Sequence, residues 1–505
     1  MRSPTRVVFY AVNGTGVGHL VRLLSIARWM RRYGAVIGAP LEAWFLTSSE
    51  ADAIVFAEGF AAFKIPSKTI VADAGLDRRA YLALAKQFVW HTLGLLRPDL
   101  LVVDTFPRGS FGELLSALDL CKHAVFVHRP VKREVAERPD FQAMLPLYDA
   151  IVVPEHHAEG QLFLPDAVRD RVVHVGPVLS RERCEILPRE EARARLGVGA
   201  ASCVYVSAGG GGDRGAEAHL HTVVAALRRD PSIAVVVGSG PLYRGRPVPG
   251  ATTLPGAAAE YMAAFDVAVC AAGYNTFGEL MFAGVPTVFL PQEKLADDQA
   301  ARAQRAVDAG AARVLGPDEE LGAEDRTGTV GERQGQLLGA VHALLGDASA
   351  RDAARSIVPE NCARQAAAEI LRLVHGEAEM DGLEAALDDA RLADARALDE
   401  RTTLELAGRL RRGRLGEDEA ALDAAVELVR ARPAGARELR GLIDAVIRAD
   451  PSGTIATQGG VVRACVEALG AFVGGEGAAA RLVVAEGFVG GAEELAHAIR
   501  ARVPR

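Results

Sequence analysis

The sequence has no run of about 18 apolar residues, the length that a helix needs to cross a membrane. It does not begin with an apolar core and a small-residue cleavage site, and residues 6–12 already read as a strand, so we expect no signal peptide. Basic residues are not in excess, because 57 Lys and Arg stand against 65 Asp and Glu, giving a formal net charge of −8. Since non-specific nucleic-acid binding needs a basic face, we expect no nucleic-acid partner. Without a predicted signal peptide or membrane-spanning helix, we expect a cytoplasmic protein.

Cysteine is scarce: there are six, with no close pair, at positions 121, 184, 203, 270, 362 and 465. Several lie in apolar segments that read as strands, which predicts buried free thiols in a reducing compartment. The adjacent His156 and His157 point in different directions and lack a spaced third ligand, which argues against a metal site there. We therefore expect no metal site.

A length of 505 residues predicts two or three domains. Half of the residues are hydrophobic, which is enough for large cores. Apolar strands alternate with amphipathic helices through most of the chain, which predicts α/β domains. We expect one Rossmann-like domain over residues 1–178 and a second over 179–375. Aromatic residues then become rare and Ala, Leu, Glu and Arg dominate, so residues 380–505 are predicted to form an α-helical domain. This domain has no cluster of catalytic residue types, and we interpret it as a module for a protein partner or for self-association.

Residues 266–279 are the most informative stretch. They read as a buried strand, a turn of small residues and the start of a helix. Gly273 would let the backbone turn sharply and approach a ligand, and Asn275 or Thr276 would cap the helix. Free N–H groups at a helix N-terminus favour a phosphate group.

Glu279 lies about one turn into this helix, where its carboxylate could accept hydrogen bonds from a ribose. The alternative is structural, because Thr276 and Glu279 also fit a capping box. Asp298 and Gln299 follow the next strand, residues 284–291, and so lie at the same carboxyl edge of the sheet. Open α/β sheets bind ligands at that edge, where acidic and amide groups suit sugar hydroxyls.

The first predicted strand ends in a glycine turn, and His19 follows in the first turn of a helix. His19 replaces the third glycine of a G-x-G-x-x-G fingerprint, so we do not expect a nicotinamide cofactor. The helix dipole disfavours the imidazolium, and a neutral imidazole at a cleft can act as a general base. The alternative is a histidine that only hydrogen-bonds the glycine turn.

Further polar or flexible groups follow other strands. Asp104 ends one buried strand, and His128 and Arg129 end the next, which makes all three candidates for acceptor binding. Four glycines at residues 209–212 follow the first strand of the second domain and could bring N–H groups close to an anion. The alternative for this run is a flexible loop without a ligand.

The stretch from Cys270 to Gln299 resembles the nucleotide-sugar signature of GT-B glycosyltransferases. It is most similar to the family 28 group, which includes the N-acetylglucosaminyltransferase that completes lipid II. The resemblance covers residues 1 to about 375 and implies two Rossmann-like domains facing a cleft. It also implies that the turn at 272–276 holds the donor diphosphate, Glu279 the ribose and Asp298-Gln299 the donor sugar. Ala272 stands where a serine is common, which removes one hydroxyl contact to phosphate.

The resemblance implies roles for residues outside this stretch. His19 would deprotonate the acceptor hydroxyl, and backbone groups near Leu254 would contact uracil. The glycine loop at residues 209–212 would lie across the cleft from the first glycine loop and help to cover the diphosphate. The donor-binding set is then Gly16, Gly210, Gly211, Gly212, Leu254, Gly273, Tyr274, Asn275, Thr276, Glu279, Asp298 and Gln299.

Together these features predict a bacterial, inverting glycosyltransferase. It would move a sugar from a nucleotide-diphosphate sugar, expected to be uridine-linked, to a hydroxyl of a small-molecule, lipid-linked or natural-product acceptor. The resemblance also implies that no cofactor or metal ion is needed, because in GT-B enzymes helix N-termini and glycine-loop amides commonly take the charge of the leaving diphosphate. Two alternatives stay open: a nucleotide-sugar epimerase of the same architecture, and a non-catalytic nucleotide-sugar-binding scaffold acting through residues 380–505.

Overall fold

The computed structural model describes residues 3–12, 16–37, 41–156, 162–213, 215–254, 257–294, 296–316 and 330–388. Most of the α-helical domain predicted for residues 380–505 therefore lies outside the described residues. Residues 8–26 and 44–366 form one compact unit that contains the whole candidate site. In the described ranges, no helix combines the length and the apolar character that crossing a membrane requires.

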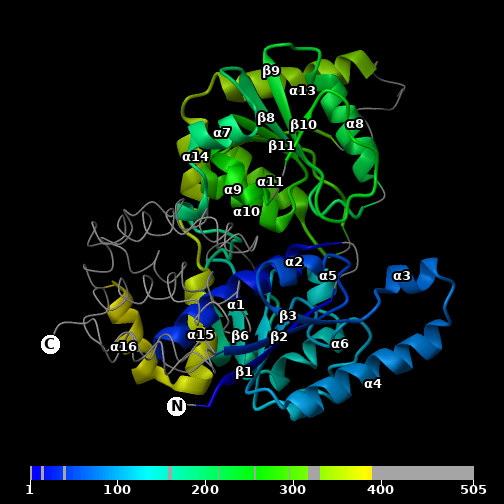
Figure 1. The fold of residues 1–505 in the computed structure, drawn as a ribbon, viewed down its shortest axis with the longest axis vertical. Helices are drawn as coiled ribbons and strands as arrows, with labels where there is room; N and C mark the ends of the chain where they lie inside the picture. Colours follow the sequence, from blue (N-terminus) through cyan, green and yellow to red (C-terminus); the bar gives the residue numbers. More distant parts are fainter. Residues whose placement is uncertain are drawn as a thin grey trace, which may run out of the picture. The chain divides into compact units, whose positions relative to one another are not determined.

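The first sheet is built from β1 (Thr5–Ala11), β2 (Leu41–Thr47), β3 (Ala61–Lys64), β4 (Leu100–Asp104), β5 (His123–Val127), β6 (Ala150–Val153) and β7 (Val172–His174). Their order in the sheet is β3-β2-β1-β4-β5-β6-β7. Figure 1 labels β1, β2, β3 and β6 of this sheet. The β2–β3, β4–β5, β5–β6 and β6–β7 pairs are parallel. The strand order changes direction between β1 and β4, so a topological switch point lies at their carboxyl ends.

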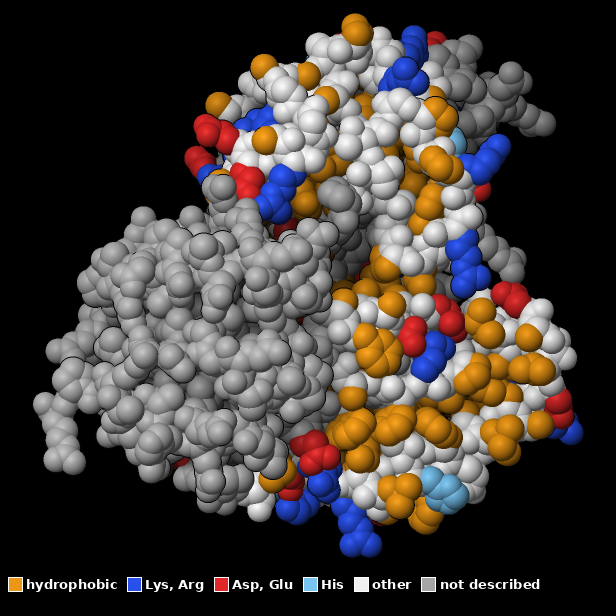
Figure 2. Space-filling view, in the orientation of Figure 1, with side chains coloured by type: hydrophobic (Ala, Val, Ile, Leu, Met, Phe, Trp, Pro, Cys, Tyr) orange, Lys and Arg blue, Asp and Glu red, His pale blue; other side chains and the backbone are white. Residues whose placement is uncertain are grey.

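The helices of this domain are α1 (Gly18–Ile37), α2 (Ala53–Ala57), α3 (Lys68–Asp73), α4 (Arg78–Leu96), α5 (Arg133–Ala136) and α6 (Pro139–Gln142). α4 buries one residue in every four, at Tyr81, Ala85, Val89 and Leu93. These side chains belong to the same hydrophobic cluster as residues of β1, β4 and β5. Leu84, Phe88 and Leu95 of α4 stay exposed, and hydrophobic side chains are visible over this helix in Figure 2.

The second sheet is built from β8 (Ser202–Ser207), β9 (Ile233–Gly238), β10 (Thr252–Thr253), β11 (Val267–Cys270), β12 (Thr287–Phe289) and β13 (Ala312–Val314). Its strands are parallel, in the order β10-β9-β8-β11-β12-β13. The order changes direction between β8 and β11, where Ser207 lies in register with Cys270. The glycine loop after β8 and the turn after β11 therefore start side by side.

Helices cover both faces of this sheet. α8 (Ala216–Leu227) and α13 (Val330–Leu345) share one hydrophobic cluster with the strand residues Val204, Val206, Val267 and Val269. The other cluster joins Cys203, Tyr205, Ala268 and Cys270 to α7 (Arg189–Arg195), α9 (Ala258–Tyr261), α10 (Tyr274–Ala283), α11 (Gln299–Asp308) and α14 (Ala350–Ile357). Burial on both faces explains why these strands are continuous apolar runs in the sequence.

The predicted free thiols are found at Cys121, Cys203, Cys270 and Cys362, and the last three are buried. Burial raises the pKa of Cys121 and of Cys203 to about 12. These two thiols therefore stay protonated at neutral pH and are poor nucleophiles.

Asn361 ties the segment between the two domains to the start of α15 (Ala363–His375). Its side-chain oxygen accepts hydrogen bonds from the N–H groups of Leu179 (2.9 Å) and Ala363 (3.1 Å). Its amide nitrogen donates to the carbonyls of Leu179 and Arg181 and to the Glu182 carboxylate. Both polar atoms of this buried side chain are thus satisfied.

Residues 367–388 belong to a separate compact unit, together with 3–7 and 27–43. In this unit α15 passes through Gly376, which has φ +81°, into α16 (Glu377–Asp388). The Arg372 guanidinium donates to Glu377 at 2.7 Å and to Asp381 at 2.6 Å. These ion pairs hold the two helices at their shared turn.

Candidate active site

The helix after β11 begins earlier than the sequence suggests. α10 starts at Tyr274 with Gly273 as its N-cap, so the prediction of a cap at Asn275 or Thr276 is wrong. No side chain caps this end among the described residues, and the first intrahelical bond runs from the Phe277 N–H to the Gly273 carbonyl. The N–H groups of residues 274–276 consequently have no acceptor within the helix.

Gly273 contributes room rather than an unusual backbone shape. Its φ of −62° is open to any residue, so the passage from β11 into α10 does not depend on a glycine conformation. A Cβ at this position would meet no atom within 4 Å. The glycine therefore keeps the space in front of the α10 N-terminus open.

Glu279 is not part of a capping box. Because α10 begins at Tyr274, Thr276 is its third residue and Glu279 its sixth. The Glu279 carboxylate instead accepts a hydrogen bond from the Ser180 hydroxyl at 2.6 Å, and burial raises its pKa. A carboxylate with one hydrogen bond keeps further acceptor positions for a ligand.

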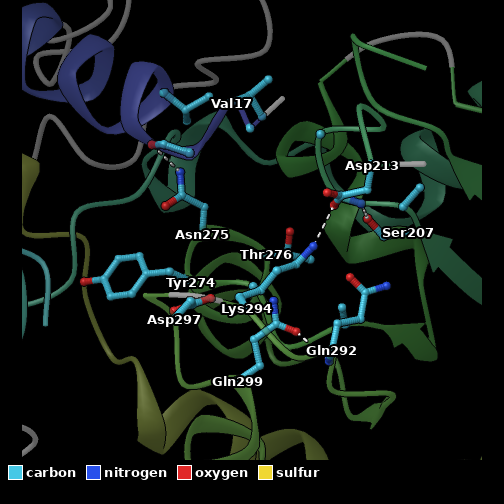
Figure 3. Close-up of a pocket in the computed structure, with 18 of the residues that line it drawn as sticks. Val17, Ser207, Asp213, Tyr274, Asn275, Thr276, Gln292, Lys294, Asp297 and Gln299 are labelled. Carbon is cyan, nitrogen blue, oxygen red and sulfur yellow. Dashed lines mark hydrogen bonds and ion pairs between the residues drawn. The ribbon is translucent and has the colours of Figure 1, made fainter. Parts of the chain in front are cut away.

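A cavity of about 420 Å³ joins loops of both domains, a size typical of small-molecule sites (Figure 3). The Asn275 amide nitrogen links its two sides by donating to the Gly18 carbonyl at 3.1 Å. Most of the predicted site residues line the cavity, namely Gly16, His19, Arg129, Gly210, Gly273, Tyr274, Asn275, Thr276, Glu279 and Gln299. The predicted residues outside its lining are Asp104, His128, Gly211, Gly212, Leu254 and Asp298.

His19 is the second residue of α1, and its Nδ1 lies 2.6 Å from Oδ1 of Asp104. A neutral ring that donates through Nδ1–H to this carboxylate carries its lone pair on Nε2. Burial lowers the pKa of His19. The Asp104 carboxylate offsets only part of this lowering, and the charges of Arg22 and Arg129 add to it. His19 is thus a neutral, oriented imidazole in the wall of the cavity.

Asp104 is held from three directions. The Arg22 Nε donates to Oδ2 at 2.7 Å and its Nη2 to Oδ1 at 2.9 Å, while the Thr105 hydroxyl donates to Oδ1 at 2.6 Å. Burial alone would raise the pKa of Asp104, but Arg22 and His19 hold it well below its ordinary value. Asp104 is therefore an anion that orients His19, and it has no exposed surface for an acceptor.

The turn after β4 is strained. Thr105 has φ +62°, which is unusual for a β-branched residue, and the Phe106 N–H donates back to the Asp104 carbonyl at 2.7 Å. This tight turn brings the Phe106 ring to 5.5 Å from the His19 ring. Such strain is found where the surrounding structure requires one side-chain arrangement.

Arg22, Asp297 and Arg302 are site residues that the sequence reasoning missed. Arg22 is 1% exposed and lies 5.1 Å from the centre of the Tyr274 ring. Asp297 lines the cavity and pairs with Arg129 at 2.9 Å and with Arg302 at 2.8 Å. The spacing of Arg22 from His19, one helical turn among buried leucines, was the available signal for the first of these.

Tyr274 lies where these networks meet. Its ring is 5.9 Å from the Arg129 guanidinium and 5.3 Å from that of Arg302, and its hydroxyl donates to the Pro154 carbonyl. Burial raises the pKa of the phenol, so it stays a donor. Tyr274 thus connects the two domains besides lining the cavity.

The neighbouring acids Asp297 and Asp298 have different surroundings. Asp298 is exposed and caps α11, because its Oδ1 accepts from the Ala301 N–H at 3.0 Å. Gln299 is buried, and its side-chain oxygen accepts from the Gln292 N–H at 3.0 Å. The structure therefore brings Asp297 and Gln299 to the cavity and leaves Asp298 at the helix end.

The glycine run after β8 divides between two cavities. Gly210 lines the first, where a Cβ would come to 3.4 Å from Val17 of the other domain. Gly211 has φ +78°, and with Gly212 it lines a second cavity of about 400 Å³. The two cavities share Asp213 and Ala216.

His128 and Leu254 lie in packed regions. His128 is buried, stacks on Phe126 at 5.2 Å, and has no hydrogen-bond partner for either ring nitrogen among the described residues. Burial, with Arg129 beside it, lowers the pKa of His128 to about 4. The Leu254 N–H extends the β9 ladder by donating to the Val237 carbonyl at 2.9 Å. The role predicted for the backbone near Leu254 includes Pro255 and Gly256, which lie outside the described residues.

Several solved structures are similar to this chain. The glycosyltransferase of kitacinnamycin is 18% identical, with a TM-score of 0.48, and the alignment covers 74% of this chain and 99% of that one. The spinosyn rhamnosyltransferase SpnG complexed with thymidine diphosphate is 18% identical, with a TM-score of 0.46, and the alignment covers 75% of this chain and 100% of that one. MurG of Acinetobacter baumannii is 16% identical, with a TM-score of 0.46, and the alignment covers 73% of this chain and 99% of that one. No curated protein sequence matches the chain.

Residues 252–324 match the family model "Glycosyltransferase family 28 C-terminal domain". This segment includes β11, α10 and β12 and continues through Asp297 and Gln299 into α11 and β13. The two parallel-sheet domains confirm the predicted α/β fold class for the described residues. The family match confirms the predicted resemblance to family 28, and with it the prediction of a glycosyltransferase, in the segment that forms the α10 end of the cavity.

Proposed function

We propose that the protein transfers a sugar from a uridine-diphosphate sugar to an acceptor hydroxyl, with inversion at the anomeric carbon and without a metal ion. One observation carries the proposal: the uncapped N-terminus of α10 borders the same cavity as His19, whose ring is oriented by buried Asp104. A helix N-terminus suits an anionic leaving group, and an oriented neutral imidazole suits proton removal. The match of residues 252–324 to family 28 supports assigning the donor to the α10 end.

The donor is proposed to bind along the second domain. Its diphosphate would lie against the N–H groups of residues 274–276, in the space beside Gly273. Its ribose hydroxyls would donate to Glu279, whose carboxylate is positioned by Ser180. Asp297 and Gln299 are the lining residues suited to the hydroxyls of the donor sugar. Contacts to uracil from the backbone near Leu254 stay part of this proposal.

In the proposed reaction, the acceptor oxygen attacks the anomeric carbon while the bond from that carbon to the diphosphate oxygen breaks. The acceptor proton passes to Nε2 of His19, and the electron pair of the broken bond stays on the nucleoside diphosphate. Attack from the opposite side inverts the configuration in a single displacement. Asp104 stabilises the imidazolium that forms, because its carboxylate lies 2.6 Å from Nδ1. General-base help of this kind is typically worth about 10²–10⁴-fold.

The acceptor is proposed to approach from the first domain. Of the three residues predicted to bind it, Arg129 lines the main cavity, whereas Asp104 would act through His19 and His128 is buried away from it. The second cavity adjoins the first at Asp213 and offers space for an acceptor larger than a single sugar. Small-molecule, lipid-linked and natural-product hydroxyls are the classes to test, and free thiols favour a reducing compartment such as the cytoplasm.

The test is UDP release by the full-length chain. The protein is incubated with a panel of UDP- and TDP-sugars and a bacterial extract as the acceptor source, with EDTA present, and the released nucleotide is measured. Glu279→Ala serves as the matched negative control for the donor site. Acceptor-dependent UDP release supports the proposal. A sugar epimer formed without acceptor would indicate the epimerase alternative, and nucleotide binding without turnover would indicate the scaffold.

A further inference from the structure

One cation at the cavity is held far less firmly than the others. Three Lys or Arg side chains line the cavity among the described residues: Arg22, Arg129 and Lys294. Arg22 is committed to buried Asp104, and Arg129 to Asp297, in pairs whose side chains are at most 12% exposed. Lys294 lies on the segment between β12 and α11, and its Nζ is 3.1 Å from Oδ2 of Asp213.

The Lys294–Asp213 pair lies at an open part of the site. The two side chains are 35% and 50% exposed. Figure 3 shows the Lys294 amino group joined by a dashed line to Asp213, and both residues line the cavity together with Thr276 in the first turn of α10. An ion pair this exposed is weak, because water and salt screen it and two flexible side chains must be held. A ligand with more negative charge than one carboxylate can therefore replace Asp213 as the partner of Lys294.

We infer that Lys294 leaves Asp213 when the donor binds and pairs with the donor diphosphate in front of the α10 N-terminus. The inference rests on the proposed function and names a residue outside the predicted site. The diphosphate would then be held by backbone N–H groups on one side and a mobile ammonium on the other. As the bond from the anomeric carbon to the diphosphate oxygen breaks, that oxygen gains negative charge, which the ammonium stabilises.

Asp213 takes the opposite role in this arrangement. Its carboxylate keeps Lys294 near the cavity when no donor is bound, but it also repels the diphosphate and competes for the ammonium. Removing the Lys294 charge should weaken nucleotide binding, whereas removing the Asp213 charge should strengthen it. A merely structural ion pair predicts no such opposite signs, because both changes would break the same contact.

The experiment measures UDP affinity of the full-length chain by isothermal titration for wild type, Lys294→Gln, Lys294→Arg and Asp213→Asn. We expect Lys294→Gln to weaken UDP binding roughly tenfold or more, as for loss of a hydrogen bond to a charged group. Asp213→Asn should strengthen it roughly two- to fivefold, the scale of an exposed charge interaction. Lys294→Arg should recover most of the affinity, since it keeps the charge. Uridine, which lacks the diphosphate, should bind all four proteins alike in an NMR titration.

The outcomes separate the inference from the proposed function. UDP binding that depends on Glu279 but is unchanged by Lys294→Gln would overturn the role of Lys294 and leave the proposed function standing. Weaker UDP binding in both Lys294→Gln and Asp213→Asn would also overturn it, because the pair would then only shape the loop. No UDP binding by the wild-type chain would overturn the proposed function and this inference with it.

Discussion

Replacing His19 tests the proposed base most directly. Alanine removes the ring, and glutamine keeps a polar group that cannot accept the acceptor proton. We expect turnover to fall about 10²–10⁴-fold in both variants, equal to about 3–5 kcal/mol of activation free energy. UDP affinity should change little, because Glu279 and the α10 N-terminus, the proposed donor contacts, belong to the second domain. The assay is acceptor-dependent UDP release, with UDP affinity measured in parallel.

The pH dependence gives a second readout of the same perturbation. The pKa of His19 lies below its ordinary value of 6.5, because burial and the charges of Arg22 and Arg129 outweigh the attraction of Asp104. Only the neutral ring can accept a proton, so wild-type turnover should rise with pH through this lowered pKa and stay high above it. The acid limb should disappear in His19→Ala and His19→Gln.

Controls keep this result interpretable. Asp104 retains Arg22 and the Thr105 hydroxyl when His19 is removed, so the free energy of unfolding should fall by only about 1 kcal/mol. His91→Ala, on the exposed face of α4, is the matched histidine control and should behave as wild type. Near-normal turnover in His19→Ala would refute the assignment of the base. Loss of UDP binding would make His19 a donor-site or structural residue instead.

Three further predictions concern other buried groups. Glu279→Ala should weaken UDP binding by about 1–3 kcal/mol in isothermal titration; a lower melting temperature with unchanged affinity would contradict the ribose assignment. The pKa of His128 is about 4 when folded and 6.5 when unfolded, so wild type should lose up to about 3 kcal/mol of unfolding free energy as pH falls through this range. His128→Phe should lose less in urea unfolding at about pH 4.5, and an equal loss would exclude His128 as the cause. Asn361→Ala should lower the free energy of unfolding by about 2–3 kcal/mol, since it leaves the N–H groups of Leu179 and Ala363 without their acceptor.

The fold and the place of the site could be predicted because both follow from patterns along the chain. Strands covered by helices on both faces need continuous apolar runs, and β8, β11 and β12 have them. Parallel strands bring the segments that follow their carboxyl ends to one edge. His19, Gly210 and Glu279 were assigned to the site for that reason, and all three line the cavity.

Side-chain partners were harder to predict, because an error of one residue in where a helix starts changes which side chain faces the cavity. The choice of Asp298 over Asp297 illustrates this point. An aspartate just before a helix has a strong preference for the N-cap, and Asp298 takes that position. Applying the capping rule at 298 would have left Asp297 as the acid for the cavity. The start of α10 at Tyr274 could not be read in the same way, because its cap is a glycine without a side-chain bond.

The pairing of Asp104 with His19 was beyond the sequence for a different reason. Both residues were expected at one sheet edge, but their contact depends on the γ-turn at Thr105, a conformation that a threonine rarely adopts. No local preference predicts this turn. It is the tertiary contacts of Asp104 with Arg22 and His19 that stabilise it.

Tyr274 connects the proposed base to the proposed donor end of the cavity. It is the first residue of α10, and its ring lies beside Arg22, which holds Asp104, which in turn orients His19. Displacement requires the acceptor oxygen, the anomeric carbon and the base to lie within about 3–3.5 Å of their partners. A buried chain of cation–π and ion-pair contacts can set that spacing before substrates arrive, because each member is held by its neighbours. Lys294, partly exposed and held among the described residues only by its pair with Asp213, is then the group that we propose follows the charge on the leaving group.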